Sequence, residues 1–473
     1  MIAIFFILFL VVLIIIGVLA NRSGKKDEDD YLLANRSLNK YFIGLSAAAT
    51  GNSGFIMTGA VGLGYSFGLT WLFLPLAWLI GDLFYWSYFP GKLNNISRQT
   101  NSRTISEILS QFSGKERKKS TIVISSFILF TILSAYTASQ YIAASKTFNI
   151  FFNIDSNIGI ILTALIIASY IILGGLRASV WTDILQIIVM AIVTLTMLLI
   201  SFYDIGGIKN LITSLNNIDP NLLAPFSGMT LTSIIGFILG WSSAAFGFGL
   251  SQPQIIVRFF AGKSPEETQK AKWTYISFLQ FTWIGMTLFG LIARALLNNV
   301  DDPESVLFVY VNNNFSSIVA AIILVGVFSA IASTIDSLVL ASGNILSVDI
   351  LKLFNNKISQ KRIAHQLSSL LTIILTVILA LYVQSSVFTL SAFAVSFLAA
   401  TVGVSVLLKI FKPNVSVFTI NTVLLVSGIF AIMWRLLGYH NFINEAFPSV
   451  IIGLLIGIIS EKILIKAKVE VTT

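Results

Sequence analysis

Residues 44–55 read Gly-Leu-Ser-Ala-Ala-Ala-Thr-Gly-Asn-Ser-Gly-Phe, and residues 236–254 read Gly-Phe-Ile-Leu-Gly-Trp-Ser-Ser-Ala-Ala-Phe-Gly-Phe-Gly-Leu-Ser-Gln-Pro-Gln. Both stretches lie inside long apolar segments, yet they carry small and polar residues where a lipid-facing helix would carry leucine. Irregular backbone at membrane depth is tolerated only where protein or a water-filled cavity satisfies its polar groups. Close packing of small residues is the other explanation for either stretch alone. Each stretch is therefore a candidate interrupted helix.

The composition is that of a polytopic membrane protein. Of the 473 residues, 56% are hydrophobic and 11% are charged, and the mean hydropathy is +0.88. A soluble domain could not bury so many apolar side chains and still have a charged surface. Apolar blocks of roughly 20 residues, enough to cross a hydrocarbon core about 30 Å thick, recur along the chain. We predict an all-α fold with about 13 transmembrane helices, at 2–20, 41–67, 70–91, 120–147, 157–175, 179–202, 229–256, 273–298, 316–347, 363–384, 387–410, 414–437 and 444–466.

The two candidate interruptions occupy corresponding places among these spans. They fall in the second and the seventh span, so they enter the bilayer from opposite faces. Interrupted helices at matching places in two halves are typical of an inverted-repeat transporter, which binds its solute and ions near the bilayer midplane. We expect one transmembrane domain over 1–473 with repeats at 41–202 and 229–410. The first helix and loop (2–40) and the last two helices (414–466) would be peripheral.

The distribution of basic residues predicts the orientation. With a cytoplasmic C-terminus, nearly all of the 30 Lys and Arg residues fall in cytoplasmic loops or the tail. The exceptions are Lys146, Lys209, Arg294 and Arg435. Cytoplasmic loops of membrane proteins are rich in Lys and Arg, so we expect a bacterial inner-membrane protein with its N-terminus outside. The net charge of +9 is then explained by loops that face the anionic lipid bilayer and requires no nucleic-acid partner.

Three connecting segments have predictable features. The apolar run at 2–20 lacks a basic region before it and a small-residue cleavage pattern after it, so we interpret it as a retained helix. Short gaps around 176 and 385 predict tight turns between antiparallel helices. In the loop at 92–119, Ile105, Ile108, Leu109 and Phe112 recur at helical spacing. This pattern predicts an amphipathic helix lying on the membrane.

The residue inventory excludes several chemistries. The chain has no cysteine and only two histidines, so disulfides, thiolate ligands and nucleophilic thiols are absent. With two histidines and no cysteine, the chain has almost none of the side chains that a zinc site or a Ser-His-Asp triad needs. An enzyme is therefore the least favoured class of protein. A channel is also disfavoured, because no stretch is similar to a filter loop or a ring of charge.

Five stretches resemble motifs of the solute:sodium symporter family, and within it the sodium/proline permeases. They are 30–38 (similar to DDYxLGGRSL), 45–54 (LSAxASxxSG), 174–175 with 181–186 (GG…WTDxxQ), 252–259 (QPHILARF) and 332–334 (MST). The resemblance covers nearly the whole chain in order and spacing. It implies a five-plus-five, leucine-transporter-like core, sodium-coupled import of a small organic solute by alternating access, and no organic cofactor.

The resemblance also implies a sodium site. The family uses main-chain carbonyls of the first interrupted helix and hydroxyl-rich groups of the ninth span, which correspond here to Ala49, Asn52, Ala330, Ser333 and Thr334. Independently, Ala330, Ser333, Thr334 and Ser337 lie on a single helix face. Carbonyl and hydroxyl oxygens suit a hard cation that has shed its water. The alternative is that these hydroxyls bond back to their own helix.

A second cation position is a further hypothesis. Asp183 is an ionisable residue within a predicted span, and such residues usually have a functional role. The resemblance implies that Asp183 is a determinant of sodium binding. The alternative is that its carboxyl group makes a structural hydrogen bond. Asp336 lies beside Ser333 and Ser337, where some relatives bind a second sodium. Two converging carboxylates both ionise readily only with a cation between them, so Asp183, Ser333, Asp336 and Ser337 would hold sodium or a proton. Alternatively, Asp336 is solvated in a cytoplasmic vestibule.

Candidate substrate residues are polar or aromatic side chains expected to face the interruptions, namely Asn52, Ser53, Tyr136, Gln140, Trp241, Phe248 and Gln252. Aromatic rings would form a wall, and amides would fix the orientation of the solute; packing alone is the alternative for the aromatics. We expect no Arg or Lys at the midplane, so a carboxylate would rely on helix N-termini. Proline permeases carry an acidic residue where this chain has Gly51 and tryptophan where it has Phe55. Proline or another small amino or carboxylic acid is the first expectation.

A second class of protein stays open. Domains similar to this family also serve as membrane inputs of sensor histidine kinases. The last apolar run fades near Ile465 and leaves no room for a kinase before Thr473. A solute-sensing module would therefore act through a separate signalling partner. The sequence gives no indication of the oligomeric state.

Overall fold

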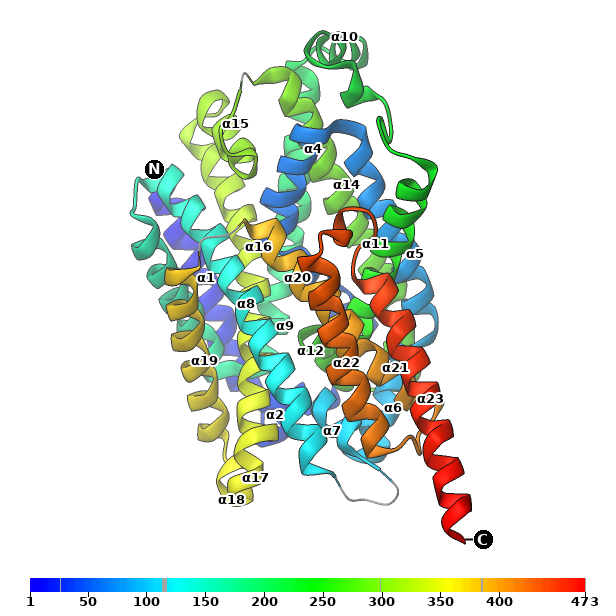
Figure 1. Ribbon diagram of the computed structural model, residues 1–473. Helices are drawn as coiled ribbons and strands as arrows, with labels where there is room; N and C mark the ends of the chain where they lie inside the picture. Colours follow the sequence, from blue (N-terminus) through cyan, green and yellow to red (C-terminus); the bar gives the residue numbers. More distant parts are fainter. Residues whose placement is uncertain (26, 113–116, 298, 384–385, 473) are drawn as a thin grey trace.

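Long helices that run between two ends of the molecule make up the fold (Figure 1). The computed structural model describes residues 1–25, 27–112, 117–297, 299–383 and 386–472, with the side chains of 464–472 left aside. The N-terminus lies toward one end of the bundle and the C-terminus at the other. The principal helices are α1 (Ile2–Ser23), α3 (Lys40–Gly51), α4 (Val61–Phe67), α5 (Phe73–Tyr88), α8 (Lys119–Phe152), α9 (Ser156–Asp204), α11 (Leu231–Ser251), α12 (Pro253–Phe260), α14 (Lys272–Leu296), α16 (Ser317–Asn344), α19 (Arg362–Tyr382), α20 (Val387–Leu398), α21 (Val404–Phe411), α22 (Val417–Leu436) and α23 (Ala446–Thr472).

Within the described residues, 11 continuous helical stretches are long and apolar enough to cross a membrane. Two of these stretches belong to two predicted spans each, because a glycine with positive φ turns the chain within them; the first half of the broken span, α3, precedes the stretch Phe55–Tyr88. Gly68 (φ +65°) separates α4 from α5, and Gly175 (φ +57°) divides α9. The predicted set of about 13 spans and the tight turn near 176 are thus confirmed. The predicted turn at 385 lies outside the described residues.

Two shorter helices, α6 (Pro90–Thr100) and α7 (Ile105–Ser110), form the segment for which a membrane-surface helix was expected. That prediction is wrong about the partner of the apolar face. Ile105 and Leu109 are buried, and α7 packs against α8 and α21. The predicted apolar face is present on α7, but other helices of the bundle cover it, and lipid does not.

The two halves of the bundle pack in a matching way. The first broken helix, α3 with α4, packs against α14, and the second broken helix begins with α11, which packs against α5. Each broken helix therefore lies against the second helix of the other half, as two inverted repeats require. Outside this core, α1 packs on α9 and α16, while α22 and α23 pack on each other.

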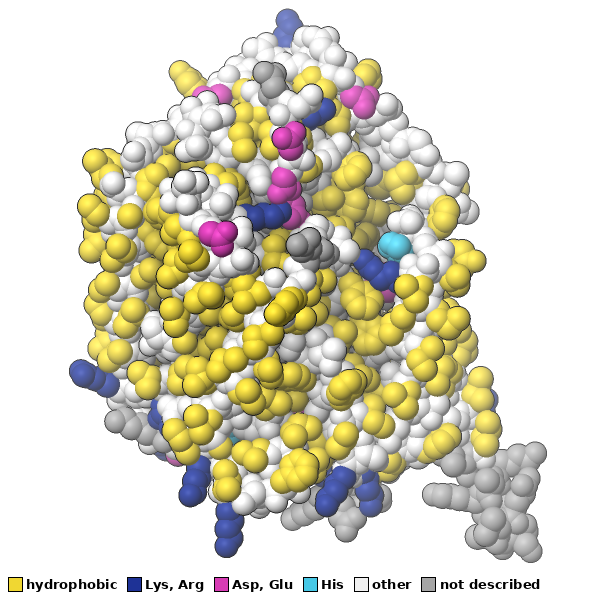
Figure 2. All heavy atoms as spheres, turned by 60° about the vertical axis from the view of Figure 1, so that its left-hand side comes forward, with side chains coloured by type: hydrophobic (Ala, Val, Ile, Leu, Met, Phe, Trp, Pro, Cys, Tyr) yellow, Lys and Arg dark blue, Asp and Glu magenta, His cyan; other side chains and the backbone are white. Residues whose placement is uncertain are grey.

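The surface is apolar around the middle of the molecule. Figure 2 shows hydrophobic side chains covering most of one face, with Lys and Arg gathered mainly toward the lower end. Many large exposed side chains, such as Ile7, Leu371 and Ile429, belong to α1, α19 and α22. Exposed apolar area of this extent is the surface of a protein whose solvent is lipid.

Candidate functional site

The first interruption lies between α3 and the π-helix η2 (Phe55–Ala60). The Asn52 side chain ends α3 by donating from Nδ2 to the Ala48 carbonyl (2.8 Å), and Thr282 of α14 donates to Asn52 Oδ1. The Gly54 backbone N–H donates to Gln140 Oε1 of α8 (2.8 Å). The Gln140 side chain of α8 therefore satisfies a backbone N–H that the break leaves without a helical partner, as membrane depth requires, and Thr282 of α14 holds the Asn52 side chain in place.

The second interruption separates α11 from α12 at Gln252. Its backbone is extended (φ −90°, ψ 105°), and Pro253 begins α12, where a missing N–H costs nothing. The Gln252 side chain stays inside the protein, because its Oε1 accepts from Gln254 Nε2 at 2.7 Å. Both interruptions predicted from the sequence are confirmed by these helix ends.

The end of α3 meets a face of hydroxyls on α16. Ser333 Oγ donates to the carbonyl of Ala49 (3.0 Å), and Thr334 Oγ1 donates to the carbonyl of Thr50 (2.9 Å). Both hydroxyls also lie within reach of the Ala330 carbonyl of their own helix, at 3.1 and 3.0 Å. The structure thus brings Ala49 and the α16 residues together. A cation there would bind to the carbonyl and hydroxyl oxygens that now bond to each other.

One detail of this oxygen cluster differs from the sequence expectation, because Thr50 contributes a carbonyl that the expected ligand set lacks. The Asn52 side chain is bonded to Ala48 and Thr282, which leaves its main-chain carbonyl, the group expected from the sequence, as its oxygen for a cation. The hydroxyls also make the bonds that the alternative interpretation expects, because Ser333 and Thr334 both lie within hydrogen-bond distance of the Ala330 carbonyl on their own helix.

Arg258 of α12 is the main departure from the sequence expectations. Its guanidinium is fully buried and donates to Asp183 Oδ2 (2.8 Å), Ser46 Oγ (2.6 Å) and Ser337 Oγ (2.7 Å). The predicted seventh span ends at 256, which places Arg258 in a loop. That placement is wrong, because α12 is a helix that packs against α3 and α16 and carries Arg258 between them. The expectation of no Arg or Lys at the midplane stays a prediction. A buried charge persists only when it is paired and hydrogen-bonded.

Asp336 lies on the other side of the same network. It is fully buried, so the alternative of a solvated carboxylate in a vestibule is wrong. Its Oδ1 accepts from Ser179 Oγ (2.9 Å) and Ser337 Oγ (3.0 Å), and its Oδ2 accepts from the Tyr170 hydroxyl (3.2 Å). The carboxylates of Asp183 and Asp336 therefore share one cluster, as the sequence suggested. The cation that the structure places beside Asp183 is Arg258.

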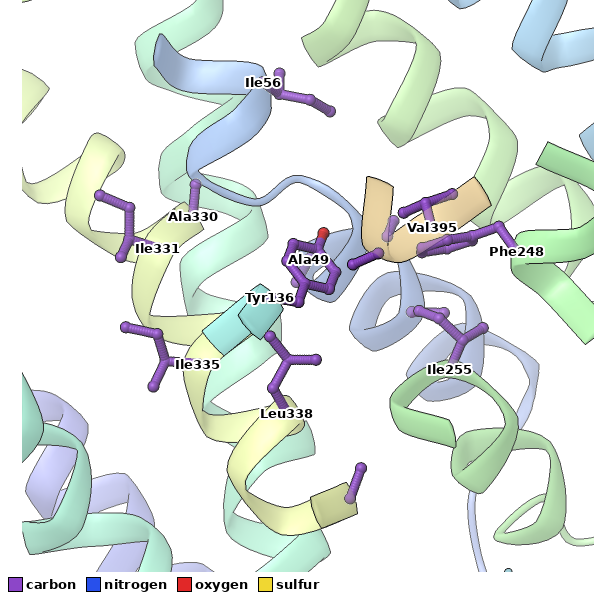
Figure 3. Close-up of a cluster of buried hydrophobic side chains, with 14 of the residues drawn as sticks. Ala49, Ile56, Tyr136, Phe248, Ile255, Ala330, Ile331, Ile335, Leu338 and Val395 are labelled. Atoms are coloured by element: carbon purple, nitrogen blue, oxygen red, sulfur yellow. The ribbon is translucent and has the colours of Figure 1, made fainter. Parts of the chain in front are cut away.

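An aromatic cavity lies beside the first interruption. Four predicted substrate residues line it: Ser53, Tyr136, Trp241 and Phe248. Figure 3 shows Tyr136 and Phe248 in the buried cluster around this cavity, together with Val395 of α20. Ser391 of α20 adds a hydroxyl to the wall. The described lining residues carry aromatic rings and hydroxyls but no charged side chain.

Two predicted substrate residues do not belong to the described lining. Gln140 binds Gly54 N–H with its oxygen, while its Nε2 lies 3.2 Å from Ser139 Oγ. Gln252 is held by Gln254. Gln140 thus holds the backbone of the first interruption, and Gln252 is bonded within the second interruption.

Sequence reasoning missed the part of the cavity wall that comes from α5 and α14. Trp78 lies on α5, and Tyr275, Leu279 and Trp283 lie on α14. The Trp78 and Trp283 rings are 5.2 Å apart at their centres, and Trp283 also contacts Phe55 of the first broken helix, 5.3 Å between centres. Tryptophan in an ordinary span gives no local signal that separates a cavity wall from packing.

A larger cavity adjoins the first and shares Trp241 and Ala392 with it. Phe388 of α20 also lines the larger cavity, and its ring stacks on Phe55 of the lower one, 5.6 Å between centres. The side chains of Trp241, Phe388 and Phe55 therefore lie between the two cavities.

These features define a class of protein. A helical membrane protein with two interrupted helices, an oxygen cluster at their break and an aromatic cavity beside it is constructed as a secondary transporter. Residues 31–417 match the family described as the sodium:solute symporter family. The chain belongs to the sodium:solute symporter family.

Individual relatives place the chain within that family without choosing a solute. It is 26% identical to the osmoregulated proline transporter OpuE of Bacillus subtilis, over 92% of this chain and 89% of the relative. It is also 26% identical to the sodium/pantothenate symporter of Haemophilus influenzae, over 92% and 90%. Among solved structures, it is similar to a substrate-bound, outward-open Na⁺-coupled sialic acid symporter, with a TM-score of 0.77 at 20% identity over 97% of this chain and 95% of that one. The fold is accordingly the leucine-transporter-like five-plus-five repeat.

Proposed function

We propose that this protein is a sodium-coupled symporter that imports a small amino or carboxylic acid by alternating access, with proline as the first candidate. The observation that carries the proposal is the meeting of Ser333 and Thr334 with the carbonyl end of α3 beside the aromatic cavity. Ion and solute would then occupy adjacent positions at one helix break. Binding of one would favour the arrangement of that break which binds the other.

The cavity supports a solute with an apolar body and few polar groups. Its aromatic rings suit a small ring or alkyl chain, and the hydroxyls of Ser53, Tyr136 and Ser391 offer hydrogen bonds. With no charged side chain in the described lining, a carboxylate would have to take backbone N–H groups near the start of η2 from their present partners, Gln140 and Ser53. Proline and pantothenate, the solutes that the relatives' names print, are both carboxylic acids.

We propose Ala49, Asn52, Ala330, Ser333 and Thr334 as the sodium ligands, with the Thr50 carbonyl as an addition from the structure. The second cation position at Asp183, Ser333, Asp336 and Ser337 stays a prediction. Arg258 already neutralises Asp183 in this arrangement. A second sodium would therefore have to displace the guanidinium from that carboxylate.

Uptake into proteoliposomes tests the proposal. Purified protein is reconstituted, and accumulation of radiolabelled L-proline and a panel of other amino and carboxylic acids is measured under an inward sodium gradient. We expect accumulation of at least one solute that stops when potassium replaces sodium. Equal uptake in sodium-free buffer under a proton gradient would refute sodium coupling. Solute binding without any accumulation would favour a sensing module that acts through a partner.

A further inference from the structure

Asp82 lies within α5, the helix that carries Trp78 of the aromatic cavity. It is 1% exposed, and within the described chain neither oxygen of its carboxyl group has a hydrogen-bond partner. The other buried carboxyl groups of the described residues each have at least one bonded oxygen; they are those of Asp30, Glu107, Asp183, Glu304, Asp336, Asp349, Glu445 and Glu461. Asp82 differs from all of them in accepting no hydrogen bond from the protein.

No Lys or Arg of the described chain forms an ion pair with Asp82. Of the elements that pack against α5, α11 and η3 (Gly68–Leu72) carry no titratable side chain. On α14, Lys272 and Arg294 each lie over an aromatic ring. The remaining charged side chains on the elements around α5 belong to α6 and α13 (Pro265–Gln269) and are those of Lys92, Arg98, Glu266 and Glu267. Asp82 therefore has no counter-charge among these residues.

These surroundings determine the protonation state of Asp82. An ionised carboxylate in an apolar environment carries a large free-energy penalty unless it is paired and hydrogen-bonded. The neutral acid avoids that penalty. The titratable groups that interact with Asp82 are the phenols of Tyr85 and Tyr275, which bring no positive charge in either protonation state. Asp82 therefore holds a proton in this arrangement of the helices.

Asp82 lies on a row of polar groups that joins the aromatic cavity to the second interruption. Trp78 and Tyr85 are four residues before and three residues after Asp82, so the three share one face of α5. Trp78 lines the aromatic cavity, and the Tyr85 ring packs on Gly249 of α11, where a Cβ would lie 2.3 Å from it. Gly249 is two residues from Ser251, at the end of α11. Within the described chain, Trp78 Nε1, Tyr85 Oη and Ser251 Oγ are buried and, like Asp82, have no partner at hydrogen-bond geometry.

We propose that Asp82 is a proton-binding site of the transport cycle. Asp82 holds its proton while the second interruption is packed as it is here. It releases the proton when that interruption opens toward the end of the molecule at which α6 lies, the lower end in Figure 1. In the release step the O–H bond of the acid breaks, its electron pair stays on the carboxylate, and water takes the proton. Asp82 takes up a new proton when the aromatic cavity opens to the other side.

The protein thus carries a proton together with its solute. This site is separate from the cluster of Asp183 and Asp336, whose carboxylates are bonded to Arg258 and to hydroxyl groups. Release during transport rests on the proposed function, because it needs the helix movements of a carrier. The protonation of Asp82 does not rest on it, and the two parts are tested separately.

Infrared spectroscopy of the purified protein tests the protonation of Asp82. The carbonyl stretch of carboxylic acids is recorded at neutral pH in light and heavy water, in which acid bands shift. A carbonyl without hydrogen bonds absorbs at higher frequency than a bonded one, so Asp82 should give the acid band of highest frequency. Asp82→Asn should lose this band. Asp155→Asn should keep it, because Asp155 is exposed and its role as N-cap of α9 is one that Asn also performs.

Proton flux tests release during transport. Proteoliposomes contain a trapped pH indicator, and potassium with valinomycin on both sides holds the membrane potential at zero. Radiolabelled L-proline and the panel of other amino and carboxylic acids are added under an inward sodium gradient. Entry of a solute should acidify the interior in wild type and Asp155→Asn. In Asp82→Asn the ratio of protons to solute should fall to the background of protein-free liposomes.

A highest-frequency acid band that survives in Asp82→Asn would overturn the proton site. If that variant does not fold, wild-type protein labelled with a heavy isotope at the aspartate carboxyl carbon replaces it, and a highest-frequency band that fails to shift has the same meaning. Solute entry without acidification in wild type would overturn release during transport. Failure of the proposed function is a different result, namely no sodium-driven accumulation of any solute, and the infrared band still decides whether Asp82 holds a proton.

Discussion

Arg258 and Asp183 should be strongly coupled in free energy. Arg258→Met leaves the Asp183 carboxylate buried without its cation, and removing one partner of a buried pair costs about 3–5 kcal/mol. Asp183→Asn keeps the shape of the side chain and removes its charge, leaving the buried guanidinium with hydroxyl and carbonyl partners only. The double variant leaves neither charge uncompensated. We expect it to be more stable than the sum of the single losses predicts, by about 2 kcal/mol or more.

The unfolding free energy is measured by SDS titration in mixed micelles, in potassium buffer so that sodium binding does not contribute. The matched control is the surface pair Lys263 and Glu267, whose charged atoms are 4.0 Å apart and whose side chains are 53% and 24% exposed. Its coupling should be under about 0.5 kcal/mol. A coupling between Arg258 and Asp183 as small as that of the control would refute the view that Arg258 compensates this carboxylate.

Three further predictions follow from the sites and the loop chemistry. Ser333→Ala and Thr334→Ala each remove an oxygen from the proposed sodium site, so each should raise the sodium concentration for half-maximal uptake about tenfold; an unchanged requirement in both would move the site elsewhere. Trp241→Ala should abolish the thermal shift caused by solute and keep the shift caused by sodium, and loss of both shifts would point to unfolding of the site. Burial opposes ionisation of Asp302, but the hydrogen bond and charge of Lys146 outweigh it and hold the pKa of that carboxyl below its ordinary value. Its contribution to stability is therefore present above about pH 4 and lost as the pH falls through the lowered value. The acid branch of the stability curve should become flatter in Asp302→Asn, and an identical branch would contradict the assignment.

Much of the fold was accessible to sequence reasoning because membrane crossing imposes length and polarity. Interruptions stood out because glycine, serine and proline replaced leucine at 44–55 and 236–254. The buried face of α7 was misassigned to lipid, because an amphipathic pattern states which face is apolar and not what covers it. The helix predicted from the apolar spacing is present as α7, and only the predicted contact of its apolar face with lipid is wrong.

The site was accessible in part, for the same physical reason. Hydroxyls of α16 could be placed on one face because Ser333 and Thr334 lie at helical spacing from Ala330. Arg258 was misplaced because it follows an apolar run and precedes other basic residues. Its partner Asp183 is 75 positions away, and only the packing of α12 against α3 and α16 brings the two together. Long-range contacts of this kind leave no trace in local spacing.

Reciprocal coupling is the most direct test of sodium symport. Proteoliposomes are given an inward gradient of the solute identified by uptake, with radioactive sodium at equal concentration on both sides. We expect transient accumulation of sodium inside, because a coupled carrier must let either gradient drive the other flux. The accumulation should fall in Ser333→Ala. Solute entry that leaves the sodium distribution unchanged would contradict sodium-coupled transport by this protein.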